Sequence, residues 1–255
     1  PNAICGKFDQ LPATEECEMI YLRSTLFFIG MVVSAPLITL FGLLVSPLPF
    51  TVRYRVISQW AFFVIWWLKV TCKLDYKVSG LEHLNSIEAG ILLSKHQSAW
   101  ETMAFQSIFP PQVWVLKRSL LWVPFFGWGL ALLKPIAIDR GAGRKALQQV
   151  IDQGIERLQS GIWVVIFPEG TRLAPGKKKK FAAGGAMLAN KSGYPAIPVA
   201  HNAGSFWARR GLLKRPGVIE VRIGAPIYPE GRSSSEINQL AEDWIDTQMA
   251  EIESL

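Results

Sequence analysis

The sequence predicts an α/β protein in which a mixed sheet flanked by helices follows a membrane-embedded helical hairpin at the N-terminus. Two patterns support this prediction. Two apolar runs precede Lys73, and after Lys73 short β-type runs alternate with helical runs. We therefore divide the 255 residues into a polar extension (1–18), a hydrophobic hairpin (19–73) and an α/β domain (74–255).

The first apolar run follows the polar extension. Residues 1–18 are polar and acidic, and they show no hydrophobic periodicity that would build a core. The run from Leu26 to Val45 contains no charged residue and has about the ~20 residues that a bilayer-crossing helix needs. Pro36 lies in its middle and is expected to kink the helix.

The second apolar run, Val56 to Leu68, is shorter and rich in tryptophan. At ~1.5 Å per residue it falls short of a ~30 Å hydrocarbon core, so we interpret it as interfacial. Basic residues flank both runs: Arg23, Arg53, Arg55, Lys69 and Lys73. A hairpin inserted into one leaflet keeps these charges at one headgroup level, whereas a single true span over 26–45 is the alternative.

The net charge indicates the kind of partner that the chain binds, and the cysteines bear on metal sites and disulfides. The net charge of +7 predicts an anionic partner, such as a lipid headgroup or a phosphorylated substrate. Because half of the residues are hydrophobic, we expect a membrane partner and no nucleic acid. Cys5, Cys17 and Cys72 show no ligand-like spacing, which predicts neither a metal site nor a disulfide framework.

The α/β domain is predicted from the alternation of strands and helices. Strands are expected at 76–78, 91–94, 113–116, 136–138, 162–167, 196–199 and 218–223. Helices are expected at 99–108, 144–159, 181–191 and 234–252. In such a fold, ligands bind at the ends of strands and in the loops that follow them.

A histidine and a carboxylate lie just after the strand expected at 91–94. On one continuous helix, His96 and Glu101 would point ~140° apart, so His96 must lie in the turn before the helix. From there its ring can meet Glu101, which would leave one ring nitrogen free as a base. The alternative is that His96 caps the helix and Glu101 complements the helix dipole.

A second polar cluster ends the strand expected at 162–167. It consists of Phe167, Pro168, Glu169, Gly170, Thr171 and Arg172. Gly170 lets the backbone approach a ligand, and Arg172 offers a planar set of donors that suits phosphate. The alternative is an ordinary surface turn.

These two motifs, HQSAWE and FPEGTR, resemble the blocks of the glycerolipid acyltransferase family. Further blocks occur in the same order: KRSL with VPFFG (117–127), IAIDR (136–140) and YPAIPV (194–199). The resemblance spans roughly residues 19–230. It implies a glycerol-3-phosphate acyltransferase-like fold and an enzyme that forms phosphatidic acid from 1-acyl-sn-glycerol 3-phosphate, a lysophosphatidic acid, by acylating its sn-2 hydroxyl. The acyl donor would be acyl-CoA or acyl carrier protein, without a further cofactor.

The resemblance also implies roles for single residues. His96 would be the general base, and Glu101, where the family usually has Asp, would orient it. Arg172, Lys117 and Arg140 would hold the acceptor phosphate. Phe167, Pro168, Glu169, Gly170 and Thr171 would shape the rest of the substrate site. The enzyme would lie in the inner membrane with its catalytic domain on the cytoplasmic side.

Several interpretations stay open at this point. The acceptor could be glycerol 3-phosphate or another lysolipid, and a non-catalytic membrane-binding protein is the alternative from a different class. Lys177 to Lys180 form either a solvated face or a docking site for anionic lipid or an acidic acyl donor. A late basic patch predicts a second membrane contact; its members are Trp207, Arg209, Arg210, Lys214 and Arg215.

Overall fold

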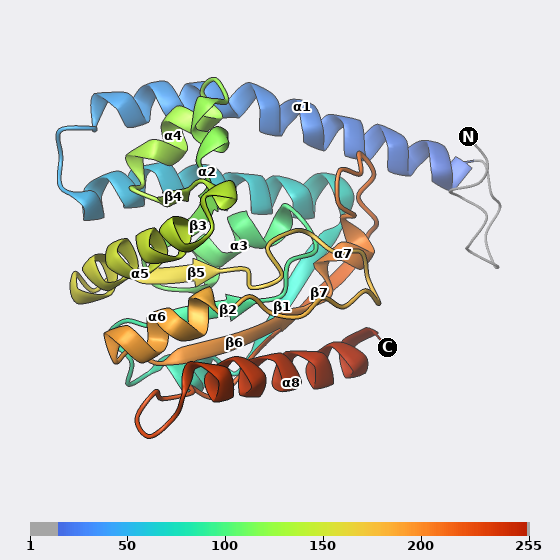
Figure 1. The fold of residues 1–255 in the computed structure, drawn as a ribbon. Helices are drawn as coiled ribbons and strands as arrows, with labels where there is room; N and C mark the ends of the chain where they lie inside the picture. Colours follow the sequence, from blue (N-terminus) through green and yellow to red (C-terminus); the bar gives the residue numbers. More distant parts are fainter. Residues whose placement is uncertain (1–14, 254–255) are drawn as a thin grey trace.

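The computed structural model describes residues 15–253, in which seven strands form one mixed sheet flanked by helices (Figure 1). Residues 1–14 of the extension predicted over 1–18 lie outside this range, whereas residues 15–18 already belong to the first helix, which begins at Glu15. The strand order is β1-β7-β6-β2-β5-β3-β4. All neighbouring strands are parallel except β6 and β7, which are antiparallel. The α/β class and the mixed sheet are therefore confirmed.

Each predicted strand is present. The strands are β1 (Leu74–Ser79), β2 (Ile91–Ser94), β3 (Gln112–Lys117), β4 (Ile136–Ile138), β5 (Trp163–Ile166), β6 (Ala196–His201) and β7 (Gly217–Ile223). Every residue of β2, β5 and β6 is buried. Strands that are covered on both faces are continuous apolar runs, which is why their positions could be predicted closely.

The helices vary more in length. They are α1 (Glu15–Leu44), α2 (Phe50–Cys72), α3 (Trp100–Ile108), α4 (Phe126–Leu132), α5 (Arg144–Gln159), α6 (Gly184–Ser192), α7 (Ala203–Phe206) and α8 (Ser234–Glu253). The 3-10 helices are η1 (Leu81–Leu84), η2 (Arg118–Trp122) and η3 (Arg140–Ala142). The short helices α4 and α7 were not predicted. The helix predicted from Phe181 was placed too early, because Phe181 packs beside α8 and α6 begins only at Gly184.

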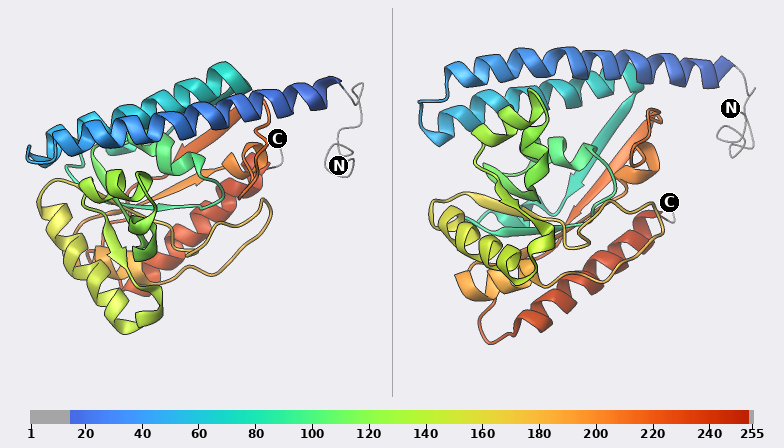
Figure 2. Two further views of the ribbon diagram at one scale, coloured as in Figure 1. Left: turned by 90° about the horizontal axis from the view of Figure 1, so that it is seen from above. Right: turned by 45° about the horizontal axis from the view of Figure 1, so that its top comes forward.

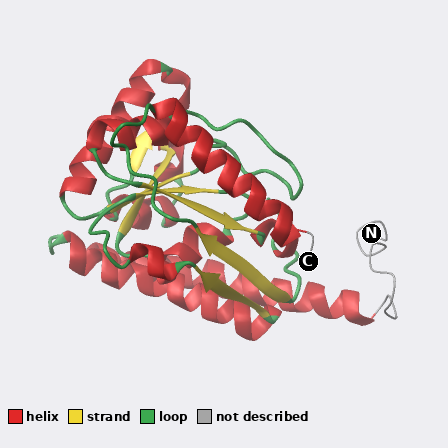
Figure 3. Cartoon of the chain, turned by 90° about the horizontal axis from the view of Figure 1, so that it is seen from below, coloured by secondary structure: helices red, strands yellow, loops and turns green. Residues whose placement is uncertain are grey.

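The helices cover the two faces of the sheet. The connection from β2 to β3, which contains α3, runs toward the β4 edge of the sheet. The connection from β4 to β5, which contains α5, runs in the opposite direction. Right-handed crossovers in opposite directions put α3 and α5 on opposite faces. Helices α6 and α8 lie on the α5 side, whereas α2 packs against α3 (Figure 1, Figure 3).

The N-terminal hairpin is present as the two neighbouring helices α1 and α2 (Figure 2). Within the described residues, one helix, Cys17–Leu44, is long and apolar enough to cross a membrane by length and composition, with a mean hydropathy of 2.3. Pro36 lies inside it. How deeply the hairpin enters a membrane stays a prediction.

Helix α2 belongs to the core of the protein as well as to the hairpin. It has 23 residues, ten more than the apolar run from Val56 to Leu68. Buried residues recur along one face, among them Ala61, Val64 and Leu68, and they join the core that the sheet and α3 form. Part of the apolar character of α2 therefore serves packing inside the protein.

The late basic patch is not one exposed surface. Trp207 and Lys214 are buried against α1, where Phe27 meets the Trp207 ring edge-on at 5.2 Å between centroids. The Lys214 ammonium lies 4.7 Å from the Trp207 ring and donates to the carbonyl of Leu212. Burial lowers the pKa of Lys214 to about 8. The interpretation as a membrane contact is thus wrong for these two residues, which join α1 to the domain.

The cysteines also differ from the expectation. Cys17 is disulfide-bonded, which the spacing of the three cysteines did not predict. Cys72 is free and buried, and burial raises the pKa of its thiol. In the folded protein Cys72 therefore acts as a small apolar side chain.

Leu68→Ala tests whether α2 is a core helix. Leu68 is fully buried, so its truncation should leave a cavity and lower the free energy of unfolding by about 2–5 kcal/mol. The control is Val70→Ala on the exposed face of the same helix, where the side chain is 53% exposed and little should change. Thermal unfolding in detergent compares both variants. Equal melting temperatures would mean that α2 does not stabilise the core.

Candidate active site

The candidate site lies at the carboxyl ends of the parallel strands. His96 follows β2, Phe167 follows β5, and Lys117 ends β3. The register pairs Leu93 in β2 with Ile166 in β5, so the turns after the two strands emerge side by side. The two motifs that are about seventy residues apart in the sequence are therefore neighbours in the fold.

His96 and Glu101 form the predicted pair. His96 lies in the turn before α3, and its Nδ1 is 2.8 Å from Glu101 Oε1. The Glu101 carboxylate also accepts hydrogen bonds from the backbone amides of Gln97 and Ser98. His96 and Glu101 therefore form the oriented pair, and Glu101 also binds amides of the turn that precedes the helix. The alternative that His96 caps the helix is wrong, because the N-cap position is Ala99 and carries no side-chain hydrogen bond.

The charge state of Glu101 sets the tautomer of His96. Glu101 is fully buried, and burial alone would raise its pKa. Hydrogen bonds from His96 and the amide of Ser98, together with the nearby His201, outweigh this effect and lower the pKa of Glu101. An ionised carboxylate only accepts, so Nδ1 of His96 must be the donor. The lone pair of Nε2 is then available as a base.

The ring of His96 is held by a second contact. Phe167 stacks on it with 4.0 Å between the ring centroids and 15° between their planes. The backbone amide of His96 donates to Glu169 Oε2, and its carbonyl accepts from the amide of Leu173. The stacking and the bonds to the other motif fix the ring and the turn that carries it.

Glu169 lies beneath the site, in a buried ion pair with Lys95. The two side chains are 1% and 4% exposed. Burial raises the pKa of Glu169, while the hydrogen bond from Lys95 opposes this rise. Glu169 does not line the cavity, so it acts on the substrate site by holding the turns after β2 and β5 together.

The rest of the second motif forms the turn itself. Pro168 is buried and its carbonyl accepts from the amide of Ala182. Gly170 has a φ of +68°, in the left-handed region that favours glycine. Thr171 is half-buried beside it. These residues bring Arg172 back to the site.

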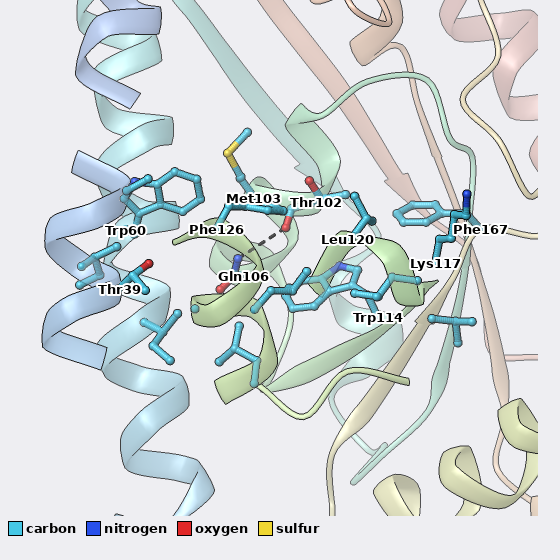
Figure 4. Close-up of a pocket in the computed structure, with 18 of the residues that line it drawn as sticks. Thr39, Trp60, Thr102, Met103, Gln106, Trp114, Lys117, Leu120, Phe126 and Phe167 are labelled. Carbon is cyan, nitrogen blue, oxygen red and sulfur yellow. Dashed lines mark hydrogen bonds between the residues drawn. The ribbon is translucent and has the colours of Figure 1, made fainter. Parts of the chain in front are cut away.

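A cavity of ≈ 380 Å³ adjoins the dyad. His96, Phe167, Lys117 and Arg172 line its polar part. The remainder is mostly apolar and comes from α1, α2, α3, β3, η2 and α4. Figure 4 shows Lys117 and Phe167 at one end and Thr39 and Trp60 at the other. The cavity thus has a cationic end beside the base and an apolar end against the N-terminal helices.

Arg172 faces this cavity with an unsatisfied donor. Its Nε is buried and has no hydrogen-bond partner in the described part of the chain. Burial lowers the pKa of Arg172. The negative charge of Glu101 raises this pKa, whereas the positive charge of the nearby Arg209 lowers it further. Arg209 also donates to the carbonyl of Arg172. The guanidinium of Arg172 at the cavity suits an anion. Arg209 does not line the cavity, and the sequence analysis grouped it with the late basic patch because nothing in the order of residues joins it to Arg172.

The other basic candidates are placed differently. Lys117 pairs in register with Ile138, two residues before Arg140, so both lie at the same end of the sheet. The side chain of Arg140 lies outside what the structure describes. In the lysine run, Lys178 pairs with Asp246, and Lys179 donates to the carbonyl of Glu169. All four lysines are exposed, and of the two side chains with these contacts only that of Lys179 reaches the second motif. Whether the run docks an anionic partner stays a prediction.

The two other histidines serve the fold. His201 is buried, accepts from the amide of Ala203 at Nδ1, and donates from Nε2 to the carbonyl of Lys95. Burial lowers its pKa. Nδ1 of His83 contacts the carbonyl of Ile223. Within residues 15–253, no group of three or more His, Cys, Asp or Glu side chains could hold a metal ion.

The combination of an oriented base, cationic side chains and an apolar cavity defines an enzyme that acts on an anionic amphiphile. The family model described as Acyltransferase matches residues 75–202. An identity of 47% relates the chain to the 1-acyl-sn-glycerol-3-phosphate acyltransferase of Pseudomonas aeruginosa, over 91% of each protein. The chain therefore belongs to the acyltransferase family, and the resemblance seen in its motifs is confirmed.

More distant proteins agree with this assignment. The 1-acyl-sn-glycerol-3-phosphate acyltransferase of Saccharomyces cerevisiae is 30% identical over 88% of this chain and 74% of its own length. The crystal structure of the 1-acyl-sn-glycerophosphate (LPA) acyltransferase from Thermotoga maritima has a TM-score of 0.77 at 24% identity. It covers 92% of this chain and 96% of that one, which confirms the fold.

Lys95→Met tests the buried ion pair. It should lower the free energy of unfolding by about 3–5 kcal/mol, because Glu169 stays buried without its cation. The double variant Lys95→Met with Glu169→Gln removes that charge and should recover part of the loss. Urea unfolding in detergent measures both. A double variant as unstable as Lys95→Met alone would contradict the charge argument.

Proposed function

We propose that this enzyme transfers a fatty acyl group from a thioester to the sn-2 hydroxyl of 1-acyl-sn-glycerol 3-phosphate and so forms phosphatidic acid. The observation that carries the proposal is that Nδ1 of His96 is tied to the buried carboxylate of Glu101 in a cavity that Arg172 and Lys117 also line. The names of the relatives support the same acceptor.

The first chemical step activates the hydroxyl. Nε2 of His96 takes the proton of the sn-2 hydroxyl while the oxygen attacks the thioester carbonyl carbon. The imidazolium that forms is stabilised by the ionised Glu101, which stays hydrogen-bonded to Nδ1. Because the acceptor attacks directly, no side chain needs to carry the acyl group.

The second step releases the thiol. The carbon–sulfur bond breaks, the ester bond remains, and the leaving thiolate takes the proton from Nε2. His96 returns to its neutral form with Nδ1 still donating to Glu101. One hydroxyl and one thioester are consumed, and one ester and one thiol are formed, so the dyad ends each turnover as it began. The donor is acyl-CoA or acyl carrier protein.

The cationic side chains would bind the acceptor phosphate. Arg172 supplies a planar guanidinium with a free Nε, and Lys117 supplies a point charge at the mouth of the cavity. Arg140, at the same end of the sheet, is a further candidate. The apolar part of the cavity takes the acyl chain. The basic residues that flank the two apolar runs support a catalytic domain at the cytoplasmic face of the inner membrane, because positive charges favour that side.

His96→Ala should reduce kcat by ~10²–10⁴-fold with little change in melting temperature, because the general base is lost and the side chain is near the surface of a cavity. Glu101→Gln should be almost as damaging. The matched control is His83→Ala, which removes a histidine remote from the dyad and should keep full activity. Retention by His96→Ala of more than about a tenth of the wild-type kcat would exclude His96 as the base.

Arg172→Lys tests the phosphate site. A lysine keeps the charge but loses the parallel hydrogen bonds, so KM should rise for 1-acyl-sn-glycerol 3-phosphate and stay the same for acyl-CoA. Arg232→Lys, which changes an exposed arginine before α8, is the control. A rise confined to the donor KM would assign Arg172 to the phosphates of coenzyme A. A lower melting temperature with both KM values raised would make it structural.

A further inference from the structure

The segment from η2 into the first turn of α4 exposes an unusual number of large apolar side chains. We call them the aromatic lip: Leu120, Trp122, Val123, Phe125, Phe126 and Trp128. Trp122 is 80% exposed, and η2 has no buried residue. Soluble surfaces seldom gather apolar side chains in one place, so such a patch indicates a partner.

The backbone of the lip is held in a strained shape. Phe125 has φ 59° and ψ −61°, and the amide of Phe126 donates to the carbonyl of Pro124 at 2.7 Å, which is a γ-turn of the rare type. Gly127 follows where a Cβ would lie 2.5 Å from the carbonyl oxygen of Leu121. Strain of this kind persists where the surrounding structure enforces it, and it is common at functional sites.

The lip is continuous with the apolar surface of α1. Helix α4 lies against α1 (Figure 2), with Thr39 Oγ1 donating to the carbonyl of Phe125 at 3.0 Å. A Cβ on Gly129 would come within 3.0 Å of Thr39, so the helices approach closely there. Helix α1 exposes a stripe of apolar side chains along its length: Leu22, Leu26, Ile29, Val33, Leu37, Leu40 and Leu44. A partner that covers this stripe would therefore also contact the lip.

The charges beside the lip indicate which partner this is. Lys117 and Arg118 are exposed immediately before it. Tryptophans next to basic residues are typical of a membrane interface, where the rings lie at the level of the headgroups and the cations meet lipid phosphates. A second copy of this chain would bring the same two cations against each other, which disfavours a dimer through the lip.

We propose that the aromatic lip inserts into the same leaflet as α1 and forms the edge over which lipid enters the cavity. Leu120 and Phe126 belong to the lip and also line the cavity, as do Ala35 and Ile38 of α1. An acyl chain can thus pass from the bilayer to the dyad between two apolar walls. The proposed insertion is supported by the exposed side chains alone, whereas the proposed entry route also rests on the proposed function.

The insertion is tested without any assay of activity. A Trp122→Cys variant of the full chain is labelled with an environment-sensitive fluorophore and bound to vesicles of phosphatidylcholine and phosphatidylglycerol. Ser235→Cys, exposed on α8 on the far side of the sheet, is the matched control (Figure 1). The unmodified chain gives the background from its native cysteines.

At Trp122→Cys we expect a blue shift and quenching by doxyl-labelled lipid, and at Ser235→Cys neither. A water-like spectrum at Trp122→Cys would overturn the proposal. A blue shift that doxyl-labelled lipid does not quench would also overturn it, since protein would then cover the lip, as in a dimer.

The entry route is tested by Trp122→Ser. Trp122 does not line the cavity, so kcat with a short-chain, water-soluble acceptor should not change. KM for long-chain acceptor in vesicles should rise roughly tenfold, the factor expected when one large apolar side chain loses its burial. Leu212→Ser, which removes an exposed leucine elsewhere, should leave both values unchanged.

The two experiments separate the two proposals. An unchanged vesicle KM with a positive insertion result would overturn the entry route and leave the membrane contact. If the unmodified chain acylates neither acceptor, the proposed function fails, and the fluorescence result still decides the insertion.

Discussion

The structure of the site depends on the carboxylate of Glu101, which accepts from the ring of His96 and from the backbone amides of Gln97 and Ser98. These bonds close the turn between β2 and α3 and keep Nε2 of the ring free. The same turn donates an amide to Glu169, whose partner is Lys95. Glu101 therefore closes the first turn and Glu169 joins that turn to the second, so a change at either carboxylate is transmitted to the base.

The strands and the dyad could be predicted because their signals are local. A buried parallel strand is a short apolar run, and the five-residue spacing of His96 and Glu101 defines a turn before a helix. Helix α4 was missed because its glycines and aromatic residues, FGWGLAL, show no helical periodicity. The contact of Arg209 with Arg172 could not be predicted either, since only the fold determines which distant residues meet.

The apolar N-terminal helices show why composition alone misleads. A run of apolar residues is compatible with burial in lipid and with burial in protein. Helix α2 uses one face for the core, where Leu68 is fully buried, whereas α1 exposes apolar side chains along its length. Phe27 of α1 nevertheless packs with Trp207 and Lys214. The hairpin is thus fixed to the catalytic domain, and its orientation in a membrane sets the orientation of the site.

This fixed arrangement orients the substrate. The cationic end of the cavity, with Lys117 and Arg172, adjoins His96, and the apolar end adjoins α1 and α2. An amphiphile that enters with its phosphate at the cations must leave its acyl chain toward α1 and α2. The phosphate of the amphiphile then stays in polar surroundings and its acyl chain in apolar surroundings. Neither group therefore has to enter surroundings of the opposite polarity on the way to the base. On the proposed insertion of α1 into one leaflet, the depth of the helix decides whether the base stands at the height of the lipid hydroxyl.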